Sequence, residues 1–91
     1  MKTVVLDGAM MTDRAGMYDY LTERLGLPGY FGRNLDALHD CLTSISEPTR
    51  LVIYRPAPML EALGQYAETA MQLLRSTAAE NPCLEVVFDA E

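Results

Sequence analysis

Residues 27–44 read LPGYFGRNLDALHDCLTS, an aromatic loop rich in glycine followed by the start of an amphipathic segment. Asn34 is a favoured helix N-cap, and the spacing predicts a helix from Asn34 to about Ile45. At about 100° per residue, the apolar positions fall on one stripe of this helix. That stripe is the predicted core face, and it consists of Leu35, Leu38, Leu42 and Ile45.

The opposite side of the same helix is polar and carries two carboxylates. Within about 100° of arc it holds Asp36, His39, Asp40 and Thr43. Two acids on a helix surface are typical of a solvated face, and on the pattern alone this alternative stays open. The neighbouring Tyr30 and Phe31 favour a binding surface because aromatic side chains are enriched in protein interfaces, although these rings could equally cover the core.

The rest of the chain alternates short apolar strands with helices. Strands are predicted at residues 3–6, 51–54 and 84–88, and further helices at residues 14–25, about 56–64 and 66–78. Apolar strands that alternate with helices usually lie parallel and are covered by those helices. We therefore expect an α/β fold with a three-stranded parallel sheet and four helices, two in each connection.

The 91 residues predict a single domain over residues 1–91, and its charge is unevenly distributed. Residues 1–33 hold four acids and four bases, so the excess of 13 acids over 7 bases lies in residues 34–91. Such a surface repels a phosphate backbone, which argues against a nucleic-acid partner, and it attracts a basic protein. An acidic surface that only aids solubility is the alternative.

No apolar run approaches the roughly 20 residues that span a bilayer, and Asp7 ends the short apolar opening. We therefore expect a cytoplasmic protein with no membrane contact. Cys41 and Cys83 fit that reducing compartment as small buried apolar residues, not as a disulfide or metal site.

Catalytic and metal-binding functions have little support in the sequence. His39 and Cys41 diverge on the predicted helix, the chain has one histidine, and no phosphate-binding glycine motif, CxxC or HExxH occurs. Asp36, His39 and Asp40 have the helical spacing of metal ligands, but a fourth ligand is missing. We expect no enzyme activity, no metal and no cofactor.

The stretch at residues 27–43 matches the string LP-x-Y-[YF]-G-x-N-L-D-A-L-x-D-C-L-T, and there the sequence resembles the barstar family of ribonuclease inhibitors. The opening strand, the LVIY strand and the closing NPCLEVVF extend the resemblance more weakly, and Cys83 matches a second family cysteine. The resemblance implies a barstar-like three-layer fold. It also implies an antitoxin that inhibits a basic, guanyl-preferring ribonuclease inside the cell.

In the family, the second helix and the loop before it enter the nuclease cleft. The resemblance implies that Asp40 occupies the position of an RNA phosphate, with Asp36 near the rim and Tyr30 against the catalytic histidine of the nuclease. The matching contacts are Tyr30, Gly32, Asn34, Leu35, Asp36, Asp40 and Thr43. Phe31, His39, Ser44 and Glu80 complete the predicted partner-binding set. We expect the unbound protein to be a monomer.

Several positions of the helix at residues 34–45 and its loop depart from the family pattern. His39 stands where the family's namesake has tryptophan, and Ser44 and Ile45 replace a glycine and a second tryptophan. Protonation of His39 would add positive charge to a face meant for a basic partner. Arg33 replaces an acid beside the interface and also adds positive charge.

The last helix departs from the pattern too. The family's acidic contact there falls at Thr77 and its next acid at Asn81, with Glu80 adjacent. These differences predict a partner with a different periphery, or a lower affinity. The alternative function is a barstar-like interaction module that binds another basic protein or itself, without inhibiting a ribonuclease.

Overall fold

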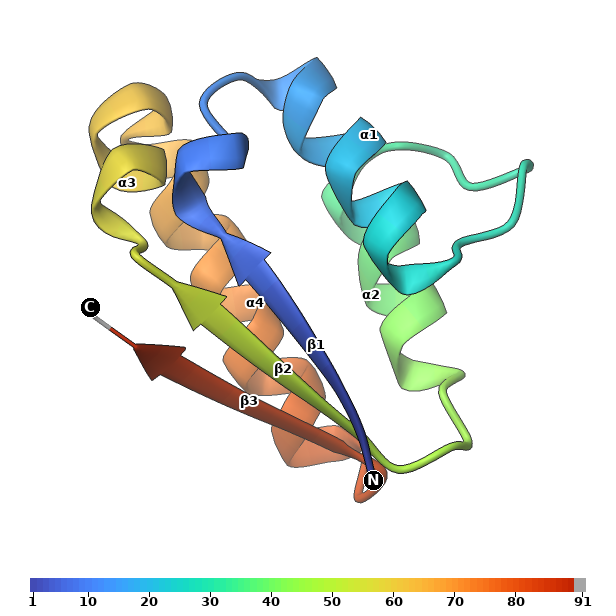
Figure 1. Ribbon diagram of the computed structural model, residues 1–91. Coiled ribbons are helices and arrows are strands. Elements are labelled where there is room, and N and C mark those ends of the chain that lie inside the picture. The colour runs from blue at the N-terminus through green and yellow to red at the C-terminus, as the bar shows by residue number, and fades with distance from the viewer. Residues whose placement is uncertain (90–91) are drawn as a thin grey trace.

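The computed structural model describes residues 1–89, and within them three parallel strands are joined by helices (Figure 1). The sheet has the order β1-β2-β3, with β1 (Lys2–Asp7), β2 (Thr49–Tyr54) and β3 (Leu84–Asp89). The helices are η1 (Gly8–Met10, a short 3-10 helix), α1 (Arg14–Leu25), α2 (Leu35–Thr43), α3 (Ala57–Leu63) and α4 (Gln65–Glu80). The predicted α/β fold, with three parallel strands and four α-helices, is confirmed.

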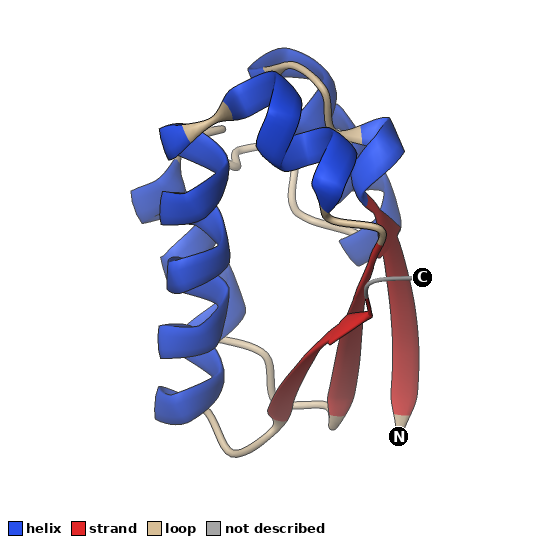
Figure 2. Ribbon diagram, turned by 90° about the vertical axis from the view of Figure 1, so that its left-hand side faces the viewer, coloured by secondary structure: helices blue, strands red, loops and turns tan. Residues whose placement is uncertain are grey.

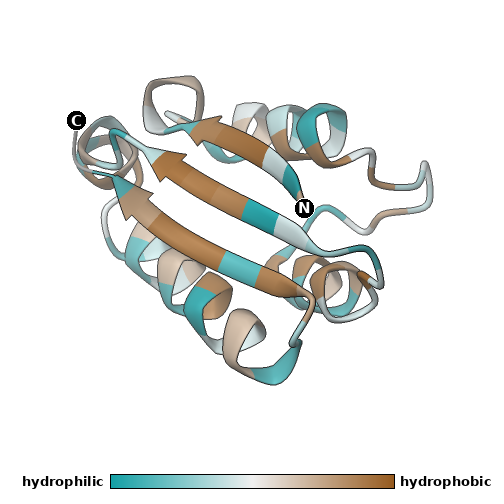
Figure 3. Ribbon diagram, turned by 60° about the horizontal axis from the view of Figure 1, so that its bottom comes forward, coloured by the Kyte–Doolittle hydropathy of each residue, from teal (hydrophilic) through white to brown (hydrophobic). Residues whose placement is uncertain are grey.

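The sheet buries one of its two faces. Leu6 pairs with Ile53, which pairs with Phe88, and these residues point into the core together with Leu38 and Leu42 of α2. Figure 2 shows the helices on a single side of the sheet, and Figure 3 shows the other side open. We expected three layers with helices over the sheet. The described residues instead form a sheet covered on one face, because alternate strand residues, not all of them, are buried.

Helix capping explains where α1 and α2 begin. Asp13 accepts a hydrogen bond from the backbone N–H of Gly16 (2.6 Å), and Asn34 accepts one from that of Ala37 (2.8 Å). Gly26 follows α1 in the left-handed conformation, with φ = 64°, and α1 ends at Leu25, as the sequence predicts. Helix α2 ends at Thr43, two residues before the predicted Ile45.

Two contacts fix α2 and α1 against α4. The side-chain amide of Asn81, at the C-cap of α4, donates hydrogen bonds to the carbonyls of Leu42 (2.9 Å) and Ile45 (3.0 Å), at the end of α2. The hydroxyls of Tyr18 on α1 and Tyr66 on α4 hydrogen bond to each other, and burial, then this hydrogen bond, raises the pKa of Tyr18. Helices α1 and α4 therefore hold α2 in place with its outer side toward solvent.

The structure bears on the predictions for the two cysteines and for a membrane-spanning helix. Cys41 and Cys83 are free thiols and are half-buried, so the prediction that both are buried is wrong. The Cys83 thiol donates to the carbonyl of Ser46 (3.4 Å). Within residues 1–89, none of the helices is long and apolar enough to cross a membrane.

Candidate partner-binding face

The two carboxylates of α2 point into solvent, as the helix pattern predicts. The Asp40 side chain is 87% exposed, and Asp36 is exposed one turn earlier. Within residues 1–89, neither carboxylate forms an ion pair with an arginine or lysine. Two negative charges about 6 Å apart along the helix axis thus remain available to a cation outside this chain.

Glu80, at the end of α4, extends the acidic surface of α2. Its carboxylate lies 3.2 Å from Nε2 of His39, and Nδ1 of His39 lies 3.9 Å from the carboxylate of Asp40. We call Asp36, Asp40 and Glu80, with His39 between them, the acidic face. The structure therefore brings together four members of the predicted partner-binding set from two helices.

The two aromatic residues of the preceding loop differ in their exposure. Tyr30 is 90% exposed and, with Asp40, lines an open groove of about 360 Å³ between the loop and α2. Phe31 is only 7% exposed, and its ring packs against that of Tyr18, with centroids 5.9 Å apart. The Phe31 ring thus covers the core, the alternative that the sequence left open, and a partner contact of Phe31 stays a prediction.

Gly32, Asn34 and Leu35 shape the loop more than they offer side chains to a partner. The Asn34 amide donates to the carbonyl of Gly32 (3.2 Å) while its oxygen caps α2. A Cβ on Gly32 would lie 3.2 Å from the Cβ of Ala37, tighter than ordinary packing. Leu35 is half-buried against the core. These three residues shape the turn from the loop into α2.

The hydroxyls at the end of α2 are directed at their own helix. Thr43 donates to the carbonyls of His39 and Asp40 (both 3.0 Å), and Ser44 donates to the carbonyl of Asp40 (2.8 Å). A partner can still reach the exposed Ser44 and the half-buried Thr43, whose hydroxyl oxygens remain acceptors.

Arg33 does not place its positive charge on the acidic face. Its guanidinium lies 2.7 Å from the carboxylate of Asp19 and donates to the carbonyl of Ala15 (3.2 Å), both on α1. The carboxylate of Asp19 thus pairs with the positive charge that Arg33 was expected to add beside the interface.

Two predicted family positions on α4 lie inside the protein. Thr77 is fully buried, and its hydroxyl donates to the carbonyl of Leu73 (2.8 Å). Asn81 is also buried, and its side-chain amide donates a hydrogen bond to the end of α2. Neither can be a surface contact, so Glu80 is the acid through which α4 joins this surface.

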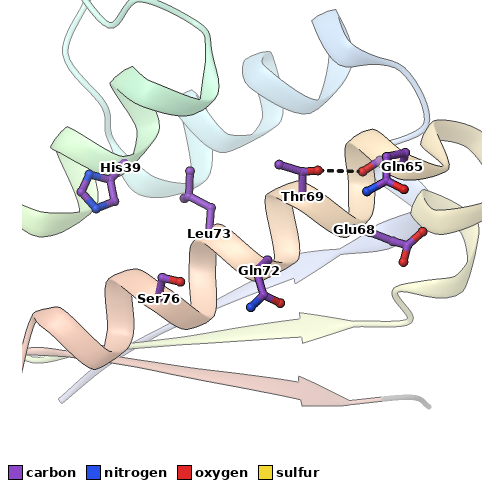
Figure 4. A pocket seen from close by; sticks show the side chains of 7 residues that line it. All are labelled: His39, Gln65, Glu68, Thr69, Gln72, Leu73 and Ser76. Carbon is purple, nitrogen blue, oxygen red and sulfur yellow. Dashed lines mark hydrogen bonds between the residues drawn. The ribbon is translucent and has the colours of Figure 1, made fainter.

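An open groove between α2 and α4 escaped the sequence reasoning (Figure 4). It has a volume of about 500 Å³ and is lined by His39 and by Gln65, Glu68, Thr69, Gln72, Leu73 and Ser76 of α4. The recurrence of polar residues every three or four positions in this helix was the available signal. Within the described residues, no three histidine, cysteine or acidic side chains are grouped as a metal site would require.

Comparison with known proteins shows the family of the chain. The Barstar (barnase inhibitor) family model matches residues 1–89. A Bacillus subtilis (strain 168) protein with the name "Putative ribonuclease inhibitor YrdF" is 33% identical over 81 residues, which cover 88% of this chain and 89% of that protein. The match spans the sheet, the helices and the acidic face, and the chain belongs to the barstar family.

Proposed function

We propose that this protein inhibits a basic, guanyl-preferring ribonuclease by covering its active-site cleft with the acidic face and the Tyr30 loop. The observation that carries the proposal is the pair of exposed carboxylates on α2, Asp36 and Asp40, neither of which pairs with an arginine or lysine in residues 1–89. The family and the name of the Bacillus relative support ribonuclease inhibition in general.

The proposed mechanism is substitution of one anion for another. A ribonuclease cleft presents cationic side chains to the phosphate of RNA, and a carboxylate can occupy that position. Asp40 is the proposed phosphate mimic, since it shares a groove with the exposed ring of Tyr30, which would pack against the cleft wall. The chain performs no chemistry in this mechanism, and it acts in the cytoplasm as a monomer until it binds.

The rigid support of α2 favours tight binding. The amide of Asn81 and the cap at Asn34 fix both ends of the helix, so little conformational entropy is lost when a partner binds. The negative charge, −6 overall, accelerates the encounter with a basic nuclease.

A second candidate function is self-association or binding of another basic protein. Self-association is favoured by the open sheet face, where Val5 and Val87 are 41% and 39% exposed. These residues lie on either side of Val52 in the sheet register and form an apolar strip across three strands.

Titration of a guanyl-preferring ribonuclease with the wild-type protein tests the proposed function. We expect inhibition that is complete at one inhibitor per nuclease, and its loss at the same concentrations in the Asp40→Ala variant. Glu61→Ala, which removes an exposed acid of α3, serves as the matched control and should inhibit like the wild type. Equal inhibition by Asp40→Ala and wild type would contradict the proposed site, and a wild-type dimer without inhibition would favour the second candidate.

A further inference from the structure

The groove between α2 and α4 adjoins the acidic face through His39. Nε2 of the imidazole lies 3.2 Å from the carboxylate of Glu80. The same side chain lines the groove (Figure 4). A partner that contacts both Asp36 and Glu80 must cross this side chain. The proposed interface and the groove therefore form one continuous surface.

The size of α2 makes such an extension necessary. A specific protein–protein interface covers about 800 Å² on each partner. Helix α2 has nine residues, a length of about 13 Å at 1.5 Å per residue, and only one side of it faces outward. The remaining contact area must come from the Tyr30 loop and from α4, which is the other helix beside this face.

The charge of the groove suits a basic occupant. None of its lining residues is a lysine or arginine. Arg75 of α4 is directed away from the groove, with its guanidinium 4.4 Å from the ring centroid of Phe88 on β3, and Arg14 stacks on the ring of Tyr66 at 4.0 Å. Glu68 is exposed and has no ion pair within the described residues.

We propose that this groove is a second contact for the same ribonuclease and takes up a basic segment at the edge of its cleft. An arginine or lysine of that segment would lay its alkyl chain on Leu73 and direct its charge to Glu68 and to the amide oxygen of Gln72. This inference rests on the proposed function, because the occupant is part of the nuclease that the acidic face binds. It also assigns a role to the polar side of α4. Thr77 of the same helix is buried and contributes no contact.

Charge changes at exposed groove positions test this proposal without disturbing the core. We expect Glu68→Lys to weaken binding of a guanyl-preferring ribonuclease about tenfold, through a slower association rate and a changed salt dependence. Gln72→Glu adds an acid to the groove and should tighten binding about threefold. Glu61→Lys makes the same charge change as Glu68→Lys on α3, outside the groove, and should alter affinity less than twofold.

The outcomes separate this inference from the proposed function. If Asp40→Ala abolishes binding while Glu68→Lys and Gln72→Glu bind like the wild type, the groove is not a contact and the inference is overturned. The same conclusion follows if Glu68→Lys and Glu61→Lys weaken binding equally, or if the free protein forms a dimer that Glu68→Lys dissociates. If Asp40→Ala has no effect on nuclease binding, the proposed function itself fails.

Discussion

Asp7, at the end of β1, and Asp40, on the outer side of α2, place the same side chain in opposite electrostatic settings. The Asp7 carboxylate accepts hydrogen bonds from the guanidinium of Arg55 (2.8 Å) and the backbone N–H of Ala9 (2.9 Å), and its side chain is 25% exposed. Asp40 is 87% exposed, its carboxylate lies 3.9 Å from Nδ1 of His39, and it pairs with no arginine or lysine in residues 1–89. Asp7 is therefore used within the fold, whereas Asp40 is available to a partner.

Most basic residues of the chain, like Asp7, make their contacts within the fold. Five of its seven bases are occupied away from the acidic face: Arg14 on Tyr66, Arg33 with Asp19, Arg50 with Glu85, Arg55 with Asp7, and Arg75 on Phe88. This arrangement keeps the negative potential of α2 intact. The net charge alone does not reveal it, since these pairs are distributed over the whole fold.

The largest expected effect is at Asp40, where we predict a loss of binding without a loss of stability. Asp40→Asn keeps the shape and removes the charge, so it should cost on the order of 2–5 kcal/mol of binding free energy to the nuclease. Thermal unfolding should change little, because the carboxylate is 87% exposed, pairs with no arginine or lysine in residues 1–89, and lies 3.9 Å from Nδ1 of His39. Calorimetric titration and a melting curve measure both quantities, and a lowered Tm with unchanged affinity would reverse the assigned roles.

Asp36 should have the same kind of effect at a smaller size. It lies one turn before Asp40, at the predicted rim of the interface, where water screens the charge. We expect Asp36→Ala to weaken binding by about 1 kcal/mol or less. An affinity loss larger than that of Asp40→Asn would place Asp36, not Asp40, at the centre of the interface.

Asp7 should show the opposite behaviour, with reduced stability and unchanged binding. The hydrogen bond from Arg55, then that from Ala9, holds the pKa of the Asp7 carboxyl below its usual value of 3.8. Because the pKa of this carboxyl is lower in the folded than in the unfolded protein, its ionised form stabilises the fold at pH values above the unfolded-state pKa. This contribution is lost as the pH falls through the folded-state pKa. Asp7→Asn should therefore lower the Tm by a few degrees at pH 7, with the difference disappearing in acid.

The Asp7 prediction needs melting curves of the wild type and Asp7→Asn from pH 7 down to pH 2. Nuclease affinity at pH 7 is the control and should be the same for both proteins. A constant difference in Tm at every pH would mean that the ion pair with Arg55 does not cause it.

The smallest expected effect concerns Arg33, which forms an ion pair within the fold but lies next to the Tyr30 loop. Asp19→Asn removes the carboxylate that holds the guanidinium against α1, so a positive charge is released near the Tyr30 loop. We expect association with the nuclease to slow about twofold at low salt and to recover at high salt. Stopped-flow measurements with Asp19→Asn and Arg33→Ala compare the two cases, and equal slowing in both would exclude the released charge as the cause.

The sequence predicted best those features that depend on neighbouring residues. The Asn34 cap, the bounds of α1 and the two faces of α2 follow from local spacing, and all are confirmed. The exposed positions of Asp36 and Asp40 follow from the same periodicity.

Features that depend on residues distant in the chain were not predictable in this way. The Arg55 partner of Asp7 is 48 residues away, and the burial of Phe31 depends on Tyr18 of α1. The burial of Thr77 depends on how α4 is rotated, which a position matched from the family pattern does not specify. The open sheet face likewise depends on the side on which every helix packs, and apolar strands alone do not reveal this.

Competition with a guanosine nucleotide bound in the nuclease cleft tests the central claim most directly. If Asp40 takes the position of an RNA phosphate, the inhibitor and guanosine 3′-monophosphate cannot bind together. We predict that the apparent Kd of the wild-type inhibitor rises in proportion to nucleotide concentration above the nucleotide's own Kd. An apparent Kd that stays constant, with a ternary complex detected at saturating nucleotide, would contradict the account.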